Sequence, residues 1–292
     1  MRVTEGMGYR NLLRDLERVH ERLQKAQSQI SSGKKISAPS DDPSLASDIV
    51  RLNGESAESA QYQRNLQFGQ SKLNFTDTVL DGLEIMVERT ITLAQSSISN
   101  ATAGTSGAME VDSLRDQIIS VGNTTHLGRH IFGGSQTTTP PYVKAADSSV
   151  SYQGNNAGMS VQVGRAVTLQ TQIPGSEIFS GSIDIFSTLS DLSAAMKSGN
   201  NAGIDAQIKK LQQFSDVVSV ARTKIAGFVN MGTNVASGLS ARDLSRASDL
   251  KQEQDADIAQ AISELTMSQT ALQATLAAGA QISQISLLDY LK

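Results

Sequence analysis

Two histidines four residues apart are the first candidates for chemistry. His126 and His130 are separated by Leu127, Gly128 and Arg129. In a helix this spacing places both imidazoles on one face, where they can bind a metal ion. The segment lacks the glutamate of the H-E-x-x-H zinc motif, and Gly128 weakens a helix. We therefore expect no metal site and no cofactor here.

The other candidate catalytic residues do not converge. Asp41 and Asp42 precede Pro43, a position that more often caps a helix than performs acid–base work. Gly133 and Gly134 lack the lysine and the spacing of a phosphate-binding loop. The sequence has no G-x-S-x-G motif and no cysteine, which excludes disulfides and thiolate chemistry. These observations indicate that the chain is not an enzyme.

Charge and hydropathy restrict the partners. The 292 residues include 25 basic and 29 acidic side chains, so no basic surface indicates nucleic acid as a partner. No segment approaches the roughly 18 to 20 apolar residues of a membrane span, and we expect no membrane insertion. Residues 1–6 show no apolar core and no cleavage site, so no signal peptide is predicted.

The prolines and the hydrophobic periodicity indicate where the elements lie. All five prolines fall outside residues 44–139 and 175–292, which are therefore free to form long helices. Around residues 159–173, apolar and polar residues alternate between glycines, a pattern typical of short antiparallel strands. These strands are mostly polar, so we expect an outer insert that contributes little apolar surface to the helices.

Apolar stripes mark both ends of the chain. Near the N-terminus, apolar residues recur at spacings of four and three, as in a coiled-coil seam. They are Leu12, Leu16, Val19, Leu23, Ala26 and Ile30. The stripe near the C-terminus consists of Ile258, Ile262, Leu265, Leu272, Leu276 and Leu288.

The C-terminal stripe lies on an almost uncharged segment. Between Ile258 and Leu288 the only charged residue is Glu264, whereas an exposed helix of a monomer normally carries charge. We interpret both stripes as a self-assembly seam that neighbouring copies bury. The alternative interpretation is the core helix of an ordinary bundle.

A predicted joint follows the first stripe. Gly33 stops a helix, Pro39 prevents one, and Asp41 or Asp42 can start the next helix with Pro43 in its first turn. The stretch from residue 29 to 43 closely resembles the segment after the first terminal helix of flagellin-family proteins. The segment 255–288 resembles the C-terminal helix of the same family.

Three further segments narrow the resemblance within the flagellin family. The branch that forms the hook–filament junction of the bacterial flagellum has similar residues at 39–43, at 123–125, 128–134 and 139–142, and at 174–179. The resemblance implies a structural subunit that is exported unfolded, with a chaperone, through the flagellar type III export apparatus, without a cleaved signal peptide. It implies an extracellular layer on which flagellin polymerises. The implied partners are copies of the chain itself, flagellin, and hook-associated protein 1 on the hook side.

Together these patterns predict a mainly α, flagellin-like fold. A long antiparallel helical coiled-coil bundle is built from both chain ends, with a small inserted β-rich module. The predicted modules are a terminal assembly module (1–43 with 254–292), a helical rod (44–135 with 183–253) and the β-rich module (136–182). Two alternatives remain open: a short filament flagellin, and a type III secreted effector or translocator. The second alternative lacks an apolar hairpin of membrane length.

Overall fold

The chain folds into two compact units. The computed structural model describes the backbone of residues 2–99, 101–146 and 148–290; the side chains of 2–6, 8, 101–103 and 282–290 lie outside the description. Unit 1 comprises residues 1–58 and 241–292, and unit 2 comprises residues 59–240. Helices α2 (Pro43–Ser99) and α6 (Asn201–Gln254) cross the division, so both halves of the chain build each unit.

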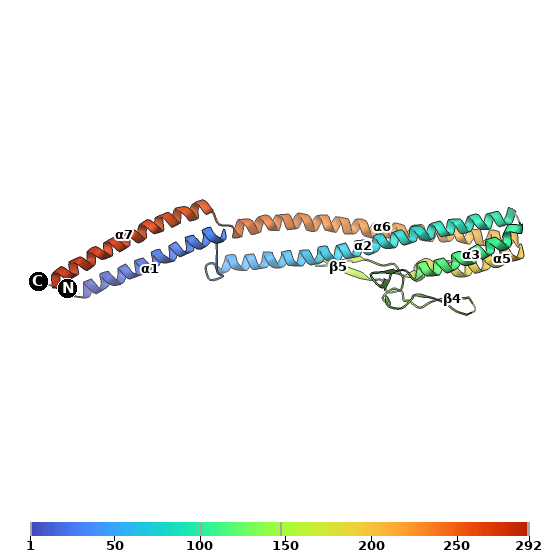
Figure 1. Ribbon diagram of the computed structural model, residues 1–292, viewed down its shortest axis with the longest axis horizontal. Coiled ribbons are helices and arrows are strands. Elements are labelled where there is room, and N and C mark those ends of the chain that lie inside the picture. The colour runs from blue at the N-terminus through green and yellow to red at the C-terminus, as the bar shows by residue number, and fades with distance from the viewer. Residues whose placement is uncertain (1, 100, 147, 291–292) are drawn as a thin grey trace. The chain divides into compact units, whose positions relative to one another are not determined.

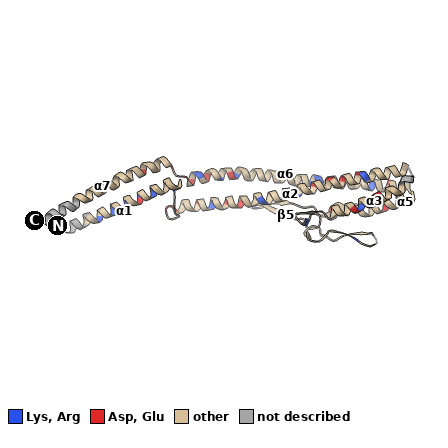
Figure 2. Ribbon diagram, viewed as in Figure 1, with Lys and Arg blue, Asp and Glu red and all other residues tan. Residues whose placement is uncertain are grey.

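Unit 1 is dominated by two helices from opposite ends of the chain. Helices α1 (Arg2–Ser32) and α7 (Ile258–Tyr290) lie side by side and run in opposite directions (Figure 1). Figure 2 shows acidic and basic residues along α1, whereas α7 is almost free of charge in its described part. The exposed face of α1 is therefore much more hydrophilic than that of α7.

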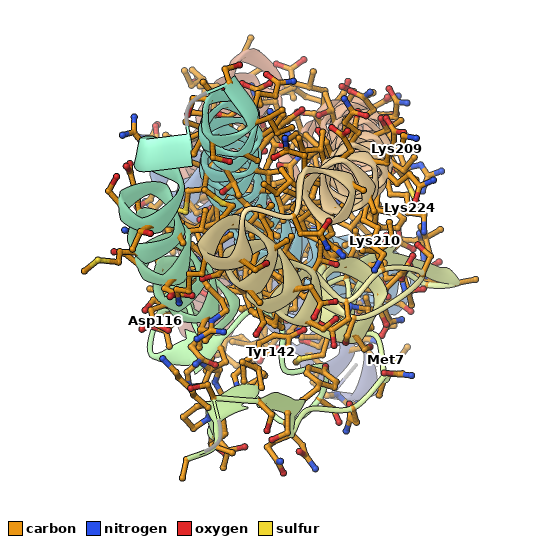
Figure 3. All side chains as sticks on the ribbon, turned by 90° about the vertical axis from the view of Figure 1, so that its right-hand side faces the viewer. Met7, Asp116, Tyr142, Lys209, Lys210 and Lys224 are labelled. Carbon is orange, nitrogen blue, oxygen red and sulfur yellow. The ribbon has the colours of Figure 1, made fainter. Side chains whose placement is uncertain are left out.

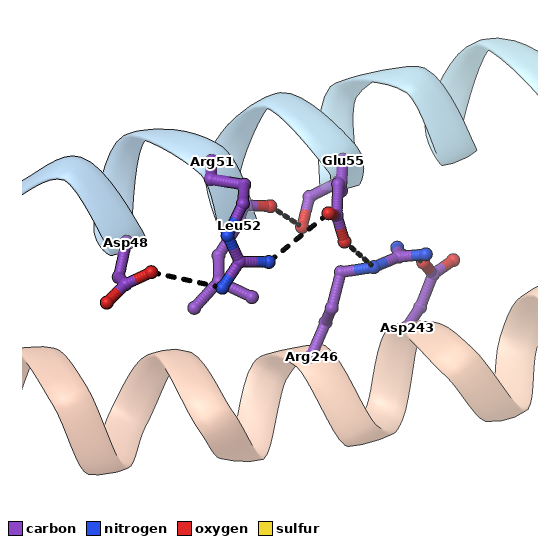
Figure 4. A network of polar contacts seen from close by, with 7 residues as sticks. Asp48, Arg51, Leu52, Glu55, Asp243 and Arg246 are labelled. Atoms are coloured by element: carbon purple, nitrogen blue, oxygen red, sulfur yellow. Dashed lines mark hydrogen bonds and ion pairs between the residues drawn. The ribbon is translucent and has the colours of Figure 1, made fainter.

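The start of α2 and the end of α6 complete unit 1 through a polar clamp. The Arg246 guanidinium lies between two carboxylates, with Nε 3.3 Å from Glu55 Oε2 and Nη1 2.6 Å from Asp243 Oδ1 (Figure 4). Arg51 also contacts Glu55, at 3.3 Å. Leu52 is buried beside this network, at 6% exposure. Because Arg246 itself is largely buried, the clamp holds the two helices together better than an exposed ion pair would.

The helices of unit 2 pack through a seven-residue repeat. Buried residues recur every seven positions on α2 and on α6, the period of a left-handed coiled coil. On α2 they are Leu66, Leu73, Leu80, Val87 and Ala94, and on α6 they are Ile204, Leu211, Val218, Ile225, Gly232 and Leu239. Helices α3 (Ala101–Gly122) and α5 (Ile185–Ser198) pack against each other and add to the same core.

One arginine joins the two long helices in unit 2. Arg222 of α6 donates from Nε to Asp77 (3.0 Å) and from Nη1 to Glu84 (2.8 Å), both on α2. These hydrogen bonds raise the pKa of Arg222. The contact fixes which side of α6 faces α2.

Three small antiparallel hairpins connect the helices. Strands β1 (Thr125–His126) and β2 (Arg129–His130) form the first, and β3 (Tyr142–Lys144) pairs with β4 (Val150–Tyr152). Strands β5 (Ser160–Gly164) and β6 (Val167–Gln170) form the third, followed by the short helix α4 (Gly175–Phe179). Each hairpin is its own two-stranded sheet.

The expectation that the strand region contributes little apolar surface is wrong. Val163 and Leu169 are fully buried, and Tyr142 and Ile173 nearly so, all within the core of unit 2. Tyr142, the first residue of β3, lies on the side of the β3–β4 hairpin that faces the helices (Figure 3). The alternating pattern looks polar as a whole, yet Val163 and Leu169 pack on the helices while the polar residues beside them stay exposed.

Two glycines allow the third hairpin to pack closely against the long helices. A Cβ atom at Gly69 of α2 would lie 3.2 Å from the Leu169 side chain, and one at Gly232 of α6 would lie 3.4 Å from it. Asn65 of α2 also donates to the Gln162 carbonyl, at 2.7 Å. The hairpin is thus built into the helical core rather than attached loosely to it.

The mainly α fold, with long helices from both chain ends and small antiparallel sheets, is confirmed. The division into three modules remains a prediction, because the structure groups the strands and the rod helices into one unit. Within the described residues, none of the helices combines the length and the apolar character needed to cross a membrane.

Candidate assembly surface

The predicted seam of α1 faces α7. Ala26 is buried, at 1% exposure, and the larger seam residues are half-buried. These larger residues are Leu12, Leu16, Val19, Leu23 and Ile30. Helix α7 covers only part of each of these side chains, and the rest of their surface stays exposed to solvent.

The matching face of α7 is made of small residues. Ala261 and Ser268 are buried, at 2% and 4% exposure. At Gly279 a Cβ atom would lie 2.9 Å from Leu12 Cδ2, so the leucine packs directly on the α7 backbone. Sequence reasoning missed these positions because it followed large apolar residues. Their spacing of seven, from residue 261 to 268, was the available signal.

The predicted C-terminal stripe divides between two faces. Leu265 and Leu272 are half-buried. Ile258, Ile262 and Leu276 remain exposed, at 41%, 50% and 54%. Leu288 also belongs to α7, but its side chain lies outside the described residues. The structure therefore leaves part of the stripe open on the surface of unit 1.

Apolar residues of α1 are exposed as well. Tyr9 is 59% exposed and Leu13 is 44% exposed. An open groove of about 390 Å³ also separates the helices near Lys25 and Gln260. In unit 2, by contrast, each long helix buries a full apolar stripe. The α1–α7 pair is thus incompletely packed by its own chain, as expected for a surface that other molecules cover.

The predicted joint is hydrogen-bonded to the link between α6 and α7. Gly33 follows α1 with a φ of 68°, the left-handed conformation of a helix C-terminus. Its carbonyl accepts from the Ala256 N–H at 2.9 Å, and the Lys35 N–H donates to the Gln254 carbonyl at 2.7 Å. These bonds tie the link after α1 to the link between α6 and α7, so both breaks are held at one place.

Two neighbouring aspartates shape the rest of the joint. Asp42 caps α2, with Oδ1 accepting from the backbone N–H groups of Ser44 and Leu45 at 3.1 and 3.0 Å. Pro43 is the first residue of α2, and Pro39 lies in the preceding turn. Backbone hydrogen bonds from Ala38 and Ser37 lower the pKa of the Asp41 carboxyl. The aspartates therefore have structural roles here.

The two histidines considered as metal ligands lie on strands rather than on one helix. His130 Nδ1 is 2.7 Å from the Asn123 carbonyl, and the His126 ring packs on Phe75 with centroids 4.9 Å apart. Among the described residues no cluster of three histidine, aspartate or glutamate side chains could hold a metal ion.

A family comparison shows which proteins the N-terminal part of the chain resembles. Residues 4–137 match the model of the bacterial flagellin N-terminal helical region. This match covers α1, the joint, α2, α3 and the first hairpin. Over these residues the chain is therefore similar to flagellins, as the resemblance in its sequence predicted.

Full-length relatives narrow the identification. Flagellar hook-associated protein 3 of Escherichia coli strain K12 is 27% identical to this chain, with all of both chains covered. A flagellin of Bacillus subtilis strain 168 is 24% identical over 97% of each chain. The solved structure of flagellar hook-associated protein 3 from Legionella pneumophila has the same fold, with a TM-score of 0.64. It is 12% identical and covers 70% of this chain and 98% of that one. Within the flagellin-like class, the chain is thus similar to flagellar hook-associated protein 3.

Proposed function

We propose that this chain is a structural subunit of the bacterial flagellum. It forms the adaptor layer at the hook–filament junction, on which flagellin polymerises. Its relation to flagellar hook-associated protein 3 over the full length of both chains supports this role. The chain acts by assembling with other molecules, and it catalyses no reaction.

The observation that carries the proposal is the incomplete packing of the α1–α7 pair. Ile258, Ile262 and Leu276 are exposed on a helix that carries almost no charge. Isolated in water, such a helix would be marginally stable and prone to associate. Burial by α1 and α7 helices of neighbouring copies removes this apolar surface from water, which makes the pair a self-assembly surface.

The partners follow from the position of the layer. Copies of the chain contact one another within the layer, hook-associated protein 1 lies on the hook side, and flagellin lies on the filament side. Before assembly, the chain passes through the flagellar type III export apparatus with a chaperone, and no signal peptide is cleaved. Its final location is extracellular, in the flagellum.

A short filament flagellin is the second candidate function. The 24% identity to a Bacillus subtilis flagellin favours it, because that relative also spans nearly the whole chain. The two roles differ in copy number, since a junction layer needs few subunits and a filament needs many. They also differ in their neighbours: a junction subunit contacts the hook on one side and the filament on the other, whereas a filament subunit contacts copies of itself on both sides.

A deletion strain tests the proposal. Cells that lack this chain should still build hooks and still synthesise flagellin, but the flagellin should be released into the medium as monomer. Small amounts of the chain supplied from a plasmid should restore filaments. Normal filaments in the deletion strain would contradict the junction role.

A further inference from the structure

The β1–β2 hairpin exposes a leucine in an unfavourable backbone conformation. Thr125 pairs with His130 and His126 pairs with Arg129, so only two residues form the turn. These are Leu127 and Gly128, with φ values of 51° and 74°. Positive φ at both positions is the geometry of a type I′ turn, which favours Asn-Gly or Gly-Gly.

Leu127 is unfavourable in two independent respects. A leucine in the left-handed region is strained by its Cβ atom. Leu127 is also 77% exposed, so most of its apolar surface stays in contact with water. Asparagine would relieve both costs. A strained and exposed apolar residue of this kind indicates a role outside the isolated subunit.

An apolar groove lies elsewhere on unit 2, between α4 and α6. Its apolar lining includes Ile178 of α4 and Val217 and Val220 of α6, and Val220 is 56% exposed. The groove has a volume of about 230 Å³. One water molecule takes about 30 Å³ in the liquid, so the groove has room for a branched side chain.

The charges at the two places are complementary. Arg129 follows the turn directly, and the only other ionisable side chains of the hairpin are two histidines. The groove is lined by Glu177, Asp216 and Lys224, where two carboxylates against one ammonium leave one net negative charge. Lys224 pairs with Glu177 on the outer surface of the unit (Figure 3). A contact between turn and groove therefore brings opposite charges together.

The hairpin and the groove face different sides of the same unit. The His126 ring packs on Phe75 of α2, so the hairpin lies against α2. Arg222 points from α6 toward α2. Val220 precedes it by two residues, about 200° around the helix, and so faces away from α2. Leu127 can therefore meet such a groove only on another copy of the chain.

We propose that Leu127 of one copy inserts into the α4–α6 groove of the next copy. Knob and groove are different patches, so the contact is heterologous. It adds copies in one direction and does not close a two-fold dimer. This inference rests on the proposed function and specifies which surfaces of unit 2 meet within the layer.

Directed cross-linking tests the contact, because the chain has no cysteine of its own. Leu127→Cys and Val220→Cys are made in separate full-length chains, which are purified, mixed in equal amounts, concentrated and oxidised. We expect the mixed disulfide to exceed the two homodimers together. A mixture of Val143→Cys with Val220→Cys is the matched control, since Val143 is an exposed valine of the neighbouring hairpin. This control should give only the random proportion.

The outcomes distinguish the contact from the proposed function. A random proportion in the test mixture, or an excess of the Leu127→Cys homodimer, overturns the contact. Filament restoration by the wild-type chain in the deletion strain reports on the proposed function separately. If filaments are restored and no mixed excess forms, this inference alone is wrong.

A second variant separates assembly from stability. Leu127→Asn removes the apolar side chain and relieves the backbone strain. The purified variant should therefore melt at the wild-type temperature or above it, yet restore filaments poorly in the deletion strain. Val143→Asn is the control and should restore filaments normally. Normal filaments with Leu127→Asn would overturn the contact, even if its melting temperature rises.

Discussion

At the residue scale, Lys72 is a buried ammonium group whose hydrogen bond goes to a side-chain amide, that of Gln172. Its side chain is 7% exposed, and its Nζ donates to Gln172 Oε1 at 2.8 Å. Gln172 Nε2 in turn donates to the Gly134 carbonyl at 3.0 Å. Burial lowers the pKa of Lys72 to about 8, and the positive charge of Arg129 adds to this shift. The folded state therefore binds this proton less tightly than the unfolded chain does.

The lowered pKa predicts a pH-dependent stability. Between pH 8 and pH 10.5 the unfolded chain holds the Lys72 proton more often than the folded chain, so stability should rise with pH in this window. Below pH 8 the contribution is constant. Urea denaturation of wild type and Lys72→Met from pH 7 to 10 measures the difference. The rise should be smaller in the variant by about 1 to 3 kcal/mol. Parallel curves for the two proteins would contradict the prediction.

The buried lysine also shows where sequence reasoning stops. The joint residues Gly33, Asp42 and Pro43 were predictable because their local chemistry dictates where a helix ends and the next begins. The environment of Lys72 could not be predicted, because its hydrogen-bond partner, Gln172, lies 100 residues later in the chain, just after β6. The strain at Leu127 was equally hidden, since it depends on a turn whose length only the strand register sets.

At the element scale, a substitution on the exposed face of helix α7 can distinguish the stability of the monomer from its ability to assemble. Ile262 is half-exposed in unit 1, so Ile262→Asp should change the free energy of monomer unfolding by less than about 1 kcal/mol. In the assembled layer the same charge would be buried without a partner, at a cost of several kcal/mol. We expect a stable monomer that fails to restore filaments. The measurements are thermal unfolding and complementation of the deletion strain.

A matched control tests whether location matters. Ile85→Asp makes the same chemical change at an exposed isoleucine of unit 2, at 61% exposure. It should leave both stability and filament formation intact. Strong destabilisation of the monomer by Ile262→Asp would instead favour an ordinary core helix.

The strand region is expected to stabilise the fold of unit 2, because it contributes buried residues to the core. Replacing residues 140–174 with a short Gly/Ser linker removes Val163, Leu169 and Ile173 from the core. Each buried apolar side chain contributes about 1.5 to 3 kcal/mol, so the variant should melt far lower than wild type. Shortening only the loop between β3 and β4, whose described residues are exposed, should cost little. Thermal unfolding of both variants checks this, and equal melting temperatures would show that the buried strand residues are dispensable.

The helices themselves show how far periodicity can be read. The N-terminal stripe can be recognised in the sequence because leucine and valine mark it, and these side chains are half-buried in α1. The facing surface of α7 was not predicted, since Ala261, Ser268 and Gly279 carry no hydrophobic signal of their own. The seven-residue repeat of α2 and α6 is present in the sequence, but charged and small residues between its members obscure it.

At the scale of the whole molecule, the two units should differ in protease resistance. Unit 2 has a continuous apolar core, whereas the α1–α7 pair buries mainly small residues. Limited proteolysis of the purified monomer should therefore cut first within α1 and α7 and leave a resistant fragment that contains unit 2 together with the rest of α2 and α6. Mass spectrometry of the fragments measures the cut sites. Cleavage of unit 2 before the terminal helices would contradict the account of incomplete packing.

The central claim is that this chain forms a thin layer between hook and filament. Immunogold electron microscopy of intact flagella, with antibodies against unit 2, tests it most directly. We predict gold particles confined to one narrow band where the filament meets the hook, and no label on filaments broken away from it. Label distributed along the length of the filament would contradict the claim and would identify the chain as a filament flagellin.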